Sequence, residues 1–334
     1  MSFVRLDPRD VVVSADTVTA PIWSTNQPTL TTFYSSSAQQ VNASAQFYIE
    51  VFATSSDAAP TQFSIAYADD LGSGSAPFNP GVPGVSPTSA IFGQAKNLVL
   101  GEESEDFTFG TVVSDSLYVM TINRSQYKEK LMPATFNITL TNGSDSVQLT
   151  DNSKDLTTTT FTEAGRVYQI VSGSDGASYD GTGTTVSGSY GWFLPDVGMI
   201  LFNAKALDLS GANGGIALAT DRATNNSNAN NQALLFDAVV DGASFSLNSE
   251  ETITSNYVFA RARSDEFNYS ANPSMIDSST GDIRHTVLIN SPRTYVTTVG
   301  LYNDNNDLLA VAKLSKPLQK DFTKEALVRI KLDY

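Results

Sequence analysis

The sequence contains no cysteine and a single histidine among its 334 residues. The absence of cysteine excludes disulfides, thiolate zinc sites, iron–sulfur clusters and cysteine nucleophiles. One histidine excludes any metal site that needs several imidazole ligands. We therefore expect neither a metal nor a cofactor.

Positive charge is also scarce, with 20 Lys and Arg against 35 Asp and Glu and a formal net charge of −15. Binding to duplex nucleic acid needs clustered cations that displace counterions, so we expect no nucleic-acid partner. The charge is uneven: residues 261–334 hold 10 basic and 9 acidic side chains, and residues 1–260 hold the other 10 and 26. Such a near-neutral segment is typical of a docking region, but ordinary alternating strands would give the same balance.

Long hydrophobic runs are absent. No stretch approaches the roughly 18 apolar residues of a membrane-spanning helix, and residues 198–202 are among the longest apolar runs. The first ten residues include acidic side chains and lack the apolar core of a secretion signal. We expect no membrane partner and synthesis in a cytoplasm.

Alternating apolar and polar positions are the dominant pattern that is present. In residues 46–52, Phe47, Ile49 and Val51 share one face, which is typical of a half-buried strand. Similar runs of β-branched and aromatic residues occur at 62–67, 116–122, 135–140, 167–171, 256–261 and 328–334. The pattern predicts a mainly β protein, with two or more antiparallel β-sandwich or barrel-like domains, few short helices and long loops.

Helical signals are few. Residues 87–100 begin with Pro87 at the first helical position, after Ser86 as a plausible N-cap. Residues 124–131 could form two helical turns, and residues 231–240 fit either a helix or a buried strand.

The loops suggest three regions along the chain. The first is a β-rich region, 1–160, with a Gly/Pro-rich loop at 70–87, and the second is a loop-rich middle region, 161–255. The third is a C-terminal β domain, 256–334, which is the candidate docking region. Within it, residues 303–307 are all Asn or Asp and predict a hairpin turn. Leu308 stands where a calcium loop needs glycine, so a metal site is disfavoured.

Catalytic signals are weak. His285 has Asp282 nearby, but no Gly-x-Ser-x-Gly element accompanies it, so a turn or interface role is favoured over a catalytic triad. Adjacent carboxylates point to opposite faces of a strand and do not form the facing pair of a glycosidase, although a dispersed pair remains an alternative. We expect no catalytic residues. Tyr179, Tyr190 and Trp192 could stack on sugars, but core or interface packing is favoured.

The C-terminal third contains a series of short motifs: Asn-Pro-Ser at 272–274, Gly-Asp-Ile-Arg-His at 281–285, Thr-Tyr-Val-Thr-Thr-Val-Gly-Leu-Tyr at 294–302, Leu-Leu-Ala-Val-Ala-Lys-Leu-Ser-Lys-Pro at 308–317 and Phe-Thr-Lys-Glu at 322–325. Together they resemble a virion structural protein of contractile-tailed phages, and in particular of the T4-like phages of marine cyanobacteria. Similar segments upstream, at 63–68, 72–75, 165–173 and 195–201, extend the resemblance over most of the chain. The motif at 298–302 and 308–313 also resembles tail-fibre-collar proteins, so it is not specific alone.

The resemblance implies a non-enzymatic virion protein in the phage tail, at the baseplate, which is assembled in the host cytoplasm. Its expected partners are other tail or baseplate proteins, in a homo- or hetero-oligomer. The resemblance supplies no catalytic residues. We predict that the 261–334 segment docks to neighbouring subunits, with Tyr295, Leu301, Tyr302 and Lys313 among its contacts.

Three alternatives stay open. The protein could be a receptor- or carbohydrate-binding module at the tail periphery that binds a host surface glycan through loop aromatics such as Trp192. It could instead be a neck- or head-associated structural protein. The third alternative is a polysaccharide-degrading enzyme with a dispersed carboxylate pair.

Overall fold

The structure is a computed structural model that describes residues 9, 11–23, 27–35, 48–55, 59–74, 86–219 and 231–333. Strands make up 46% of it and helices 14%, which confirms the mainly β, antiparallel class expected from the sequence. Most of the Gly/Pro-rich loop at 70–87 and of the Asn-rich stretch at 224–231 lies outside the described residues.

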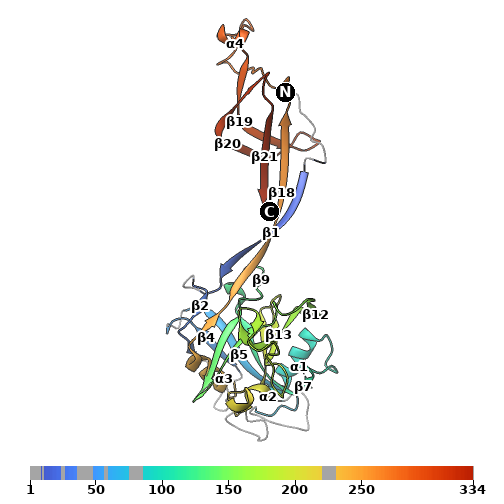
Figure 1. Cartoon of the computed structure of the whole chain (residues 1–334), viewed down its shortest axis with the longest axis vertical. Coiled ribbons are helices and arrows are strands. Elements are labelled where there is room, and N and C mark those ends of the chain that lie inside the picture. Colours follow the sequence, from blue (N-terminus) through green and yellow to red (C-terminus); the bar gives the residue numbers. More distant parts are fainter. Residues whose placement is uncertain are drawn as a thin grey trace. The chain divides into compact units, whose positions relative to one another are not determined.

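The chain forms two compact units, which are both visible in Figure 1. Unit 1 combines Met1–Thr17 with Thr252–Tyr334, and unit 2 is Val18–Glu251. This division differs from the three regions expected from the sequence. One sheet runs through the expected boundary near residue 160, because the strands on either side of it pair with each other.

Unit 2 is built on one 13-stranded sheet. Its strand order is β2 (Thr29–Leu30), β17 (Phe245–Ser246), β10 (Asn137–Asn142), β11 (Asp145–Asp151), β13 (Gly165–Ser174), β15 (Gly191–Leu194), β16 (Met199–Asn203), β8 (Ser116–Ile122), β5 (Thr61–Asp69), β4 (Tyr48–Phe52) and β3 (Tyr34–Ser35). Two short strands, β12 (Thr160–Thr162) and β14 (Ala177–Ser178), pair with β13 off this path.

Both faces of this sheet are buried. Successive side chains of a strand point to opposite faces, and in the central strands the residues of both sets lie in a core cluster. In β8, Tyr118 and Met120 belong to the larger core cluster, whereas Leu117 and Val119 belong to a second, smaller one. β15 divides in the same way, with Phe193 in the larger cluster and Trp192 and Leu194 in the smaller one. Unit 2 therefore has two complete hydrophobic cores, one on each face of its sheet.

Two helices contribute to these cores. Helix α1 (Pro87–Val99) confirms the prediction from residues 87–100, and its Phe92 and Val99 lie in the smaller core. Helix α3 (Asn231–Gly242) resolves the ambiguous segment 231–240 and packs against β10 as well as β4 and β5. Because β10 and β4 are far apart in the strand order, the sheet must curl around α3. The short helix α2 (Ala204–Leu207) follows β16.

The helix expected at 124–131 is wrong. The structure has a three-residue 3₁₀ turn, η2 (Arg124–Gln126), followed by β9 (Lys130–Leu131). The Asn123 side chain accepts a hydrogen bond from the Ser125 amide at the start of that turn. The pairing of β9 with β18 (Asn248–Ala262) then holds Lys130 and Leu131 in extended conformation. Elsewhere in unit 2, η3 (Gly211–Asn213) is a second 3₁₀ turn, and β6 (Thr108–Phe109) and β7 (Val112–Val113) form a small hairpin.

Unit 1 contains a sheet in the order β1 (Val11–Pro21), β18 (Asn248–Ala262) and β21 (Ala326–Asp333). The chain passes between the units twice, within β1 and within β18. In β21, Ile330 is buried while its neighbours Arg329 and Lys331 are exposed, so the alternation predicted for the C-terminal segment is confirmed. Unit 1 also contains the short helix α4 (Val287–Asn290) and a hairpin of β19 (Arg293–Tyr302) and β20 (Leu308–Asp321).

Candidate docking surface

Unit 1 leaves most of its large apolar side chains in water. Among the described residues, its only buried hydrophobic side chains are Val258, Met275, Ile276, Ala326 and Ile330. Both core clusters consist of residues of unit 2. The exposed large hydrophobic residues of unit 1 are Val11, Val12, Val13, Phe267, Tyr269, Val287, Ile289, Tyr295, Tyr302, Leu308, Leu309, Val311, Leu318, Phe322 and Leu327.

This distribution has an energetic consequence. Ordering a residue costs about 1–2 kcal/mol of backbone entropy, which a domain offsets chiefly by burying apolar surface. Unit 2 can do so with its two cores. Unit 1 has only five buried hydrophobic side chains among its described residues, which offset little of the entropy lost when its strands become ordered. Its exposed apolar side chains are therefore a reserve of surface that a partner could bury.

The β19–β20 hairpin is an exposed element of unit 1 that forms a two-stranded sheet of its own. Its two strands pair only with each other among the described residues, and Lys320 is the only buried residue in either strand. An isolated two-stranded hairpin is marginally stable in water, so this element needs support from outside itself.

The turn of the hairpin confirms the prediction from residues 303–307. The Asn303 side chain accepts hydrogen bonds from the amides of Asn305 (3.0 Å) and Asp307 (2.8 Å). Its Nδ2 donates to Asp307 Oδ2 at 2.9 Å. Asn306 has a φ of 63°, a conformation that Asn tolerates better than most residues. The Asn/Asp-rich segment thus caps its own backbone and connects the two strands.

At its other end, the hairpin is anchored within unit 1 by Lys320. Lys320 Nζ donates hydrogen bonds to Asn268 Oδ1 (2.9 Å), Ser264 O (3.1 Å) and Asp321 O (3.2 Å). On the paired strand, Thr294 Oγ1 donates to Phe267 O at 2.5 Å. These hydrogen bonds hold the base of the hairpin against residues 264–268.

The alternation of the strands gives the hairpin two distinct faces. One, which we call the outer face, carries exposed residues only: Thr298, Gly300, Tyr302, Leu308, Leu309, Val311 and Lys313. The register shift between Leu301 and Tyr302 brings Leu308 to the same face as Leu309. The opposite face carries half-buried residues, including Leu301. Of the predicted contacts, Tyr302 and Lys313 lie on the outer face, Tyr295 is exposed nearer the base, and Leu301 lies on the opposite face.

Charge distinguishes the two units. Counted from the sequence, unit 1 holds 12 Lys and Arg and 12 Asp and Glu, whereas unit 2 holds 8 and 23. The whole formal net charge of −15 therefore resides in unit 2. Charges of both signs are interspersed in unit 1, as in the exposed Arg261–Glu325 pair at 2.6 Å.

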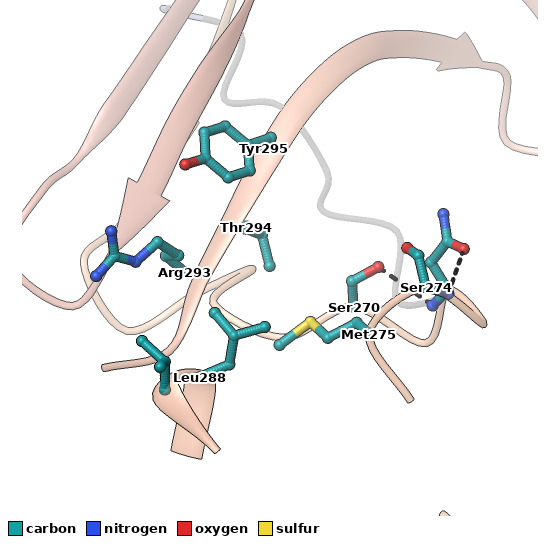
Figure 2. A pocket seen from close by; sticks show the side chains of 9 residues that line it. Ser270, Ser274, Met275, Leu288, Arg293, Thr294 and Tyr295 are labelled. Atoms are coloured by element: carbon teal, nitrogen blue, oxygen red, sulfur yellow. Dashed lines mark hydrogen bonds between the residues drawn. The ribbon is translucent and has the colours of Figure 1, made fainter. Parts of the chain in front are cut away.

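A cavity of about 510 Å³ lies between the base of the hairpin and the segments before it (Figure 2). It is lined by Ser270, Asn272, Ser274, Met275, Val287, Leu288, Arg293, Thr294 and Tyr295. The guanidinium of Arg293 forms no ion pair with any described residue, and its Nη2 donates only to Ser291 Oγ at 3.3 Å. The cavity combines a cation, hydroxyl groups and an aromatic ring, all in unit 1.

Trp192, which is among the predicted interaction residues, is buried and does not lie on the surface. It is 8% exposed and packs edge-on against Phe107 and Phe109 in the smaller core of unit 2. The strand pattern could have indicated this position, because its neighbours in β15 are apolar too. Tyr190 is also buried, and its hydroxyl donates to Gly214 O. Of the three aromatics that could stack on a sugar, only Tyr179 is exposed, and its hydroxyl donates to Gln148 Oε1.

The described residues give no catalytic constellation. His285 is exposed, and no hydrogen bond joins its side chain to a described residue. No group of three or more His, Asp or Glu side chains in these segments is placed to hold a metal ion. No helix in this part of the chain is long and apolar enough to cross a lipid bilayer.

Comparisons of the chain with family models, curated proteins and solved structures found no match.

Proposed function

We propose that this protein is a non-enzymatic structural component of a contractile phage tail, located at the baseplate, that links neighbouring subunits through unit 1. The observation that carries the proposal is the contrast between the two complete cores of unit 2 and the exposed apolar side chains of unit 1. Monomeric soluble proteins seldom expose large contiguous apolar patches, whereas subunits of assemblies bury them against neighbours.

The assignment to a phage tail rests on the resemblance of residues 272–325 and of the upstream motifs to virion proteins. Its partners would be other tail and baseplate proteins, and assembly would take place in the host cytoplasm. The neutral charge balance of unit 1 supports docking through this unit, because acidic unit 2 would repel other acidic subunits.

The test is incorporation of variants into phage particles, followed by immunogold electron microscopy. Leu309→Asp with Val311→Asp places two charges on the outer face, and Phe161→Asp with Val186→Asp places two charges on exposed positions of unit 2 as the matched control. We expect the first pair to abolish incorporation, the control pair to leave it intact, and wild-type label at the distal tail. Label at the neck or head would overturn the baseplate location, and unlabelled particles would overturn the virion assignment.

The cavity of unit 1 favours a second candidate function, a carbohydrate-binding module for host surface glycans. Arg293 pairs with no carboxylate among the described residues. Together with the ring of Tyr295 it suits an acidic sugar, since guanidinium groups bind carboxylates and aromatic rings stack on sugar faces. Titration with acidic and neutral oligosaccharides tests it. This function is supported if the wild type binds the acidic sugar and Arg293→Met does not. If the wild type binds neither sugar, this function is removed.

A further inference from the structure

The outer face of the β19–β20 hairpin is a continuous apolar patch. The ring of Tyr302 and the side chain of Leu308 lie over Gly300, where a Cβ would come within 2.9 Å and 3.5 Å of them. Gly300 pairs with Val311, which is 58% exposed, and Leu309 next to it is 67% exposed. Tyr302, Leu308, Leu309 and Val311 leave on the order of 400 Å² of mostly apolar surface in water, a size that marks interaction sites.

We propose that the partner on this face is a second copy of the same chain, packed face to face around a two-fold axis that crosses the strands at Gly300 and Val311. This inference rests on the proposed function, because it names one of the neighbours to which unit 1 docks. Two such patches and their polar rims bury roughly 1,000 Å², which reaches the lower limit for a specific interface.

The register of the hairpin makes the face complementary to itself. A two-fold axis at Val311 reverses the strand direction, so Val311 meets its own copy and Lys313 lies over Leu309 of the second chain. Thr298, which pairs with Lys313, then faces the ring of Tyr302. The outer faces therefore match side chain by side chain.

Charge supports the same arrangement. With its methylene stem along Leu309 of the second copy, the ammonium of Lys313 can reach Asp307, which lies two residues before Leu309. Neither Lys313 nor Asp307 forms an ion pair with a described residue of its own chain, and both are exposed. Repulsion between copies is also least when they meet through unit 1, because the acidic surplus resides in unit 2.

The experiment uses the purified full chain and sedimentation velocity over a concentration series. We expect a monomer–dimer equilibrium that Lys313→Asp or Asp307→Lys each weakens roughly tenfold, since the two-fold axis doubles each loss. Combining the two substitutions should restore dimerisation to near the wild-type level, because the charge pairs re-form with reversed sign. A monomer at every concentration, or a combined variant no better than the single ones, would overturn the proposal.

Cross-linking provides a second measurement. Because the chain has no cysteine, Val311→Cys introduces its only thiol, and this thiol lies on the proposed axis. We expect a short thiol-specific cross-linker to join two Val311→Cys chains much faster than two chains carrying Val186→Cys, whose position in unit 2 is 81% exposed. Equal rates would contradict the two-fold contact.

The outcomes separate this inference from the proposed function. A monomeric wild type, with Leu309→Asp and Val311→Asp still excluding the chain from particles, would remove the second copy and leave docking to another tail protein. A dimer in solution, with no label on purified particles, would keep the inference and remove the proposed function.

Discussion

Arg166 joins two distant segments of unit 2 through charge. Its Nη2 donates to Asp196 Oδ1 at 2.8 Å and to Glu250 Oε1 at 2.9 Å, and its amide donates to Asp196 Oδ2 at 2.7 Å. Lys130 lies 3.5 Å from the same Glu250 oxygen. Burial alone would raise the pKa of Asp196, but the hydrogen bonds and charge of Arg166, with the charge of Lys130, lower it overall.

Replacement of Arg166 by methionine should lower the free energy of unfolding of unit 2 by about 2–3 kcal/mol, because two carboxylates lose a charged donor in a partly buried site. Lys205→Met is the control, since the half-exposed Lys205–Asp115 pair should contribute under about 1 kcal/mol. Urea titrations followed by circular dichroism would measure both. Equal effects of the two substitutions would contradict the prediction.

The same network predicts acid sensitivity. A carboxyl whose pKa is lowered by folding stabilises the protein fully above pH 3.8, the ordinary value for Asp, and this stability is lost as the pH falls through the lowered pKa. We therefore expect the stability difference between the wild type and Arg166→Met to shrink below that pH. A difference that stays constant to pH 2 would argue against the ion network.

The buried hydroxyl of Tyr190 predicts that the protein loses stability as the pH rises, whereas the Arg166 network predicts a loss as the pH falls. Burial, together with the negative charge of Asp180, raises the pKa of Tyr190 to about 12 from 10.0. Its contribution is complete below pH 10 and declines as the pH rises to about 12, because the unfolded chain loses the phenol proton first, with a total loss on the order of 2 kcal/mol. Stability measured from pH 9 to 12 should decline less steeply in Tyr190→Phe, and parallel curves would contradict the assignment.

At the level of elements, the alternating pattern predicted the strands well because period-two burial depends mainly on the chain itself. Residues 116–122 are strand β8 in full, and the five Asn and Asp residues at 303–307 between two β-rich segments predict the observed hairpin. The segment 124–131 could not be predicted, because a partner strand that follows 118 residues later, Ser249–Glu250, decides its extended conformation. Local sequence does not encode such a contact.

The candidate site was only partly predictable. The charge balance indicates segment 261–334, which forms most of unit 1, and Tyr302 and Lys313 lie on the outer face of its hairpin. Leu301, which is also among the predicted contacts, is half-buried on the opposite face of the hairpin. Trp192 is buried because both faces of β15 are covered, and its apolar neighbours Phe193 and Leu194 are the sequence signal for such a strand.

The sheet of unit 2 depends on a close strand approach at Gly191. A Cβ on Gly191 would lie 1.8 Å from Leu201 O in the neighbouring strand β16, and its φ of 150° is unfavourable for other residues. Gly191→Ala should cost about 3 kcal/mol or more, because both backbones must shift within a packed core. The control is Gly143→Ala, at a positive φ in open space, which should cost about 1 kcal/mol. Thermal or urea unfolding would measure the loss of stability in each variant, and equal losses would contradict the prediction.

For the whole molecule, the unequal cores predict two unfolding transitions. Unit 2 should unfold at the higher temperature, since it contains both hydrophobic clusters, and unit 1 at the lower one. Dimerisation through unit 1 would raise only the lower transition as the protein concentration increases. Calorimetry of the full chain at several concentrations checks this expectation. A single transition, or one that shifts as a whole, would show that the units unfold cooperatively.

Both tryptophans of the chain lie in unit 2, one in each core: Trp23 in the larger cluster and Trp192 in the smaller. Intrinsic tryptophan emission therefore reports on unit 2 alone, and unit 1 contributes only tyrosine fluorescence. Replacing either tryptophan by phenylalanine leaves a single emitter on one side of the sheet. The protein thus carries its own pair of spectroscopic probes, which can tell whether the two faces of one sheet lose their packing together or in sequence.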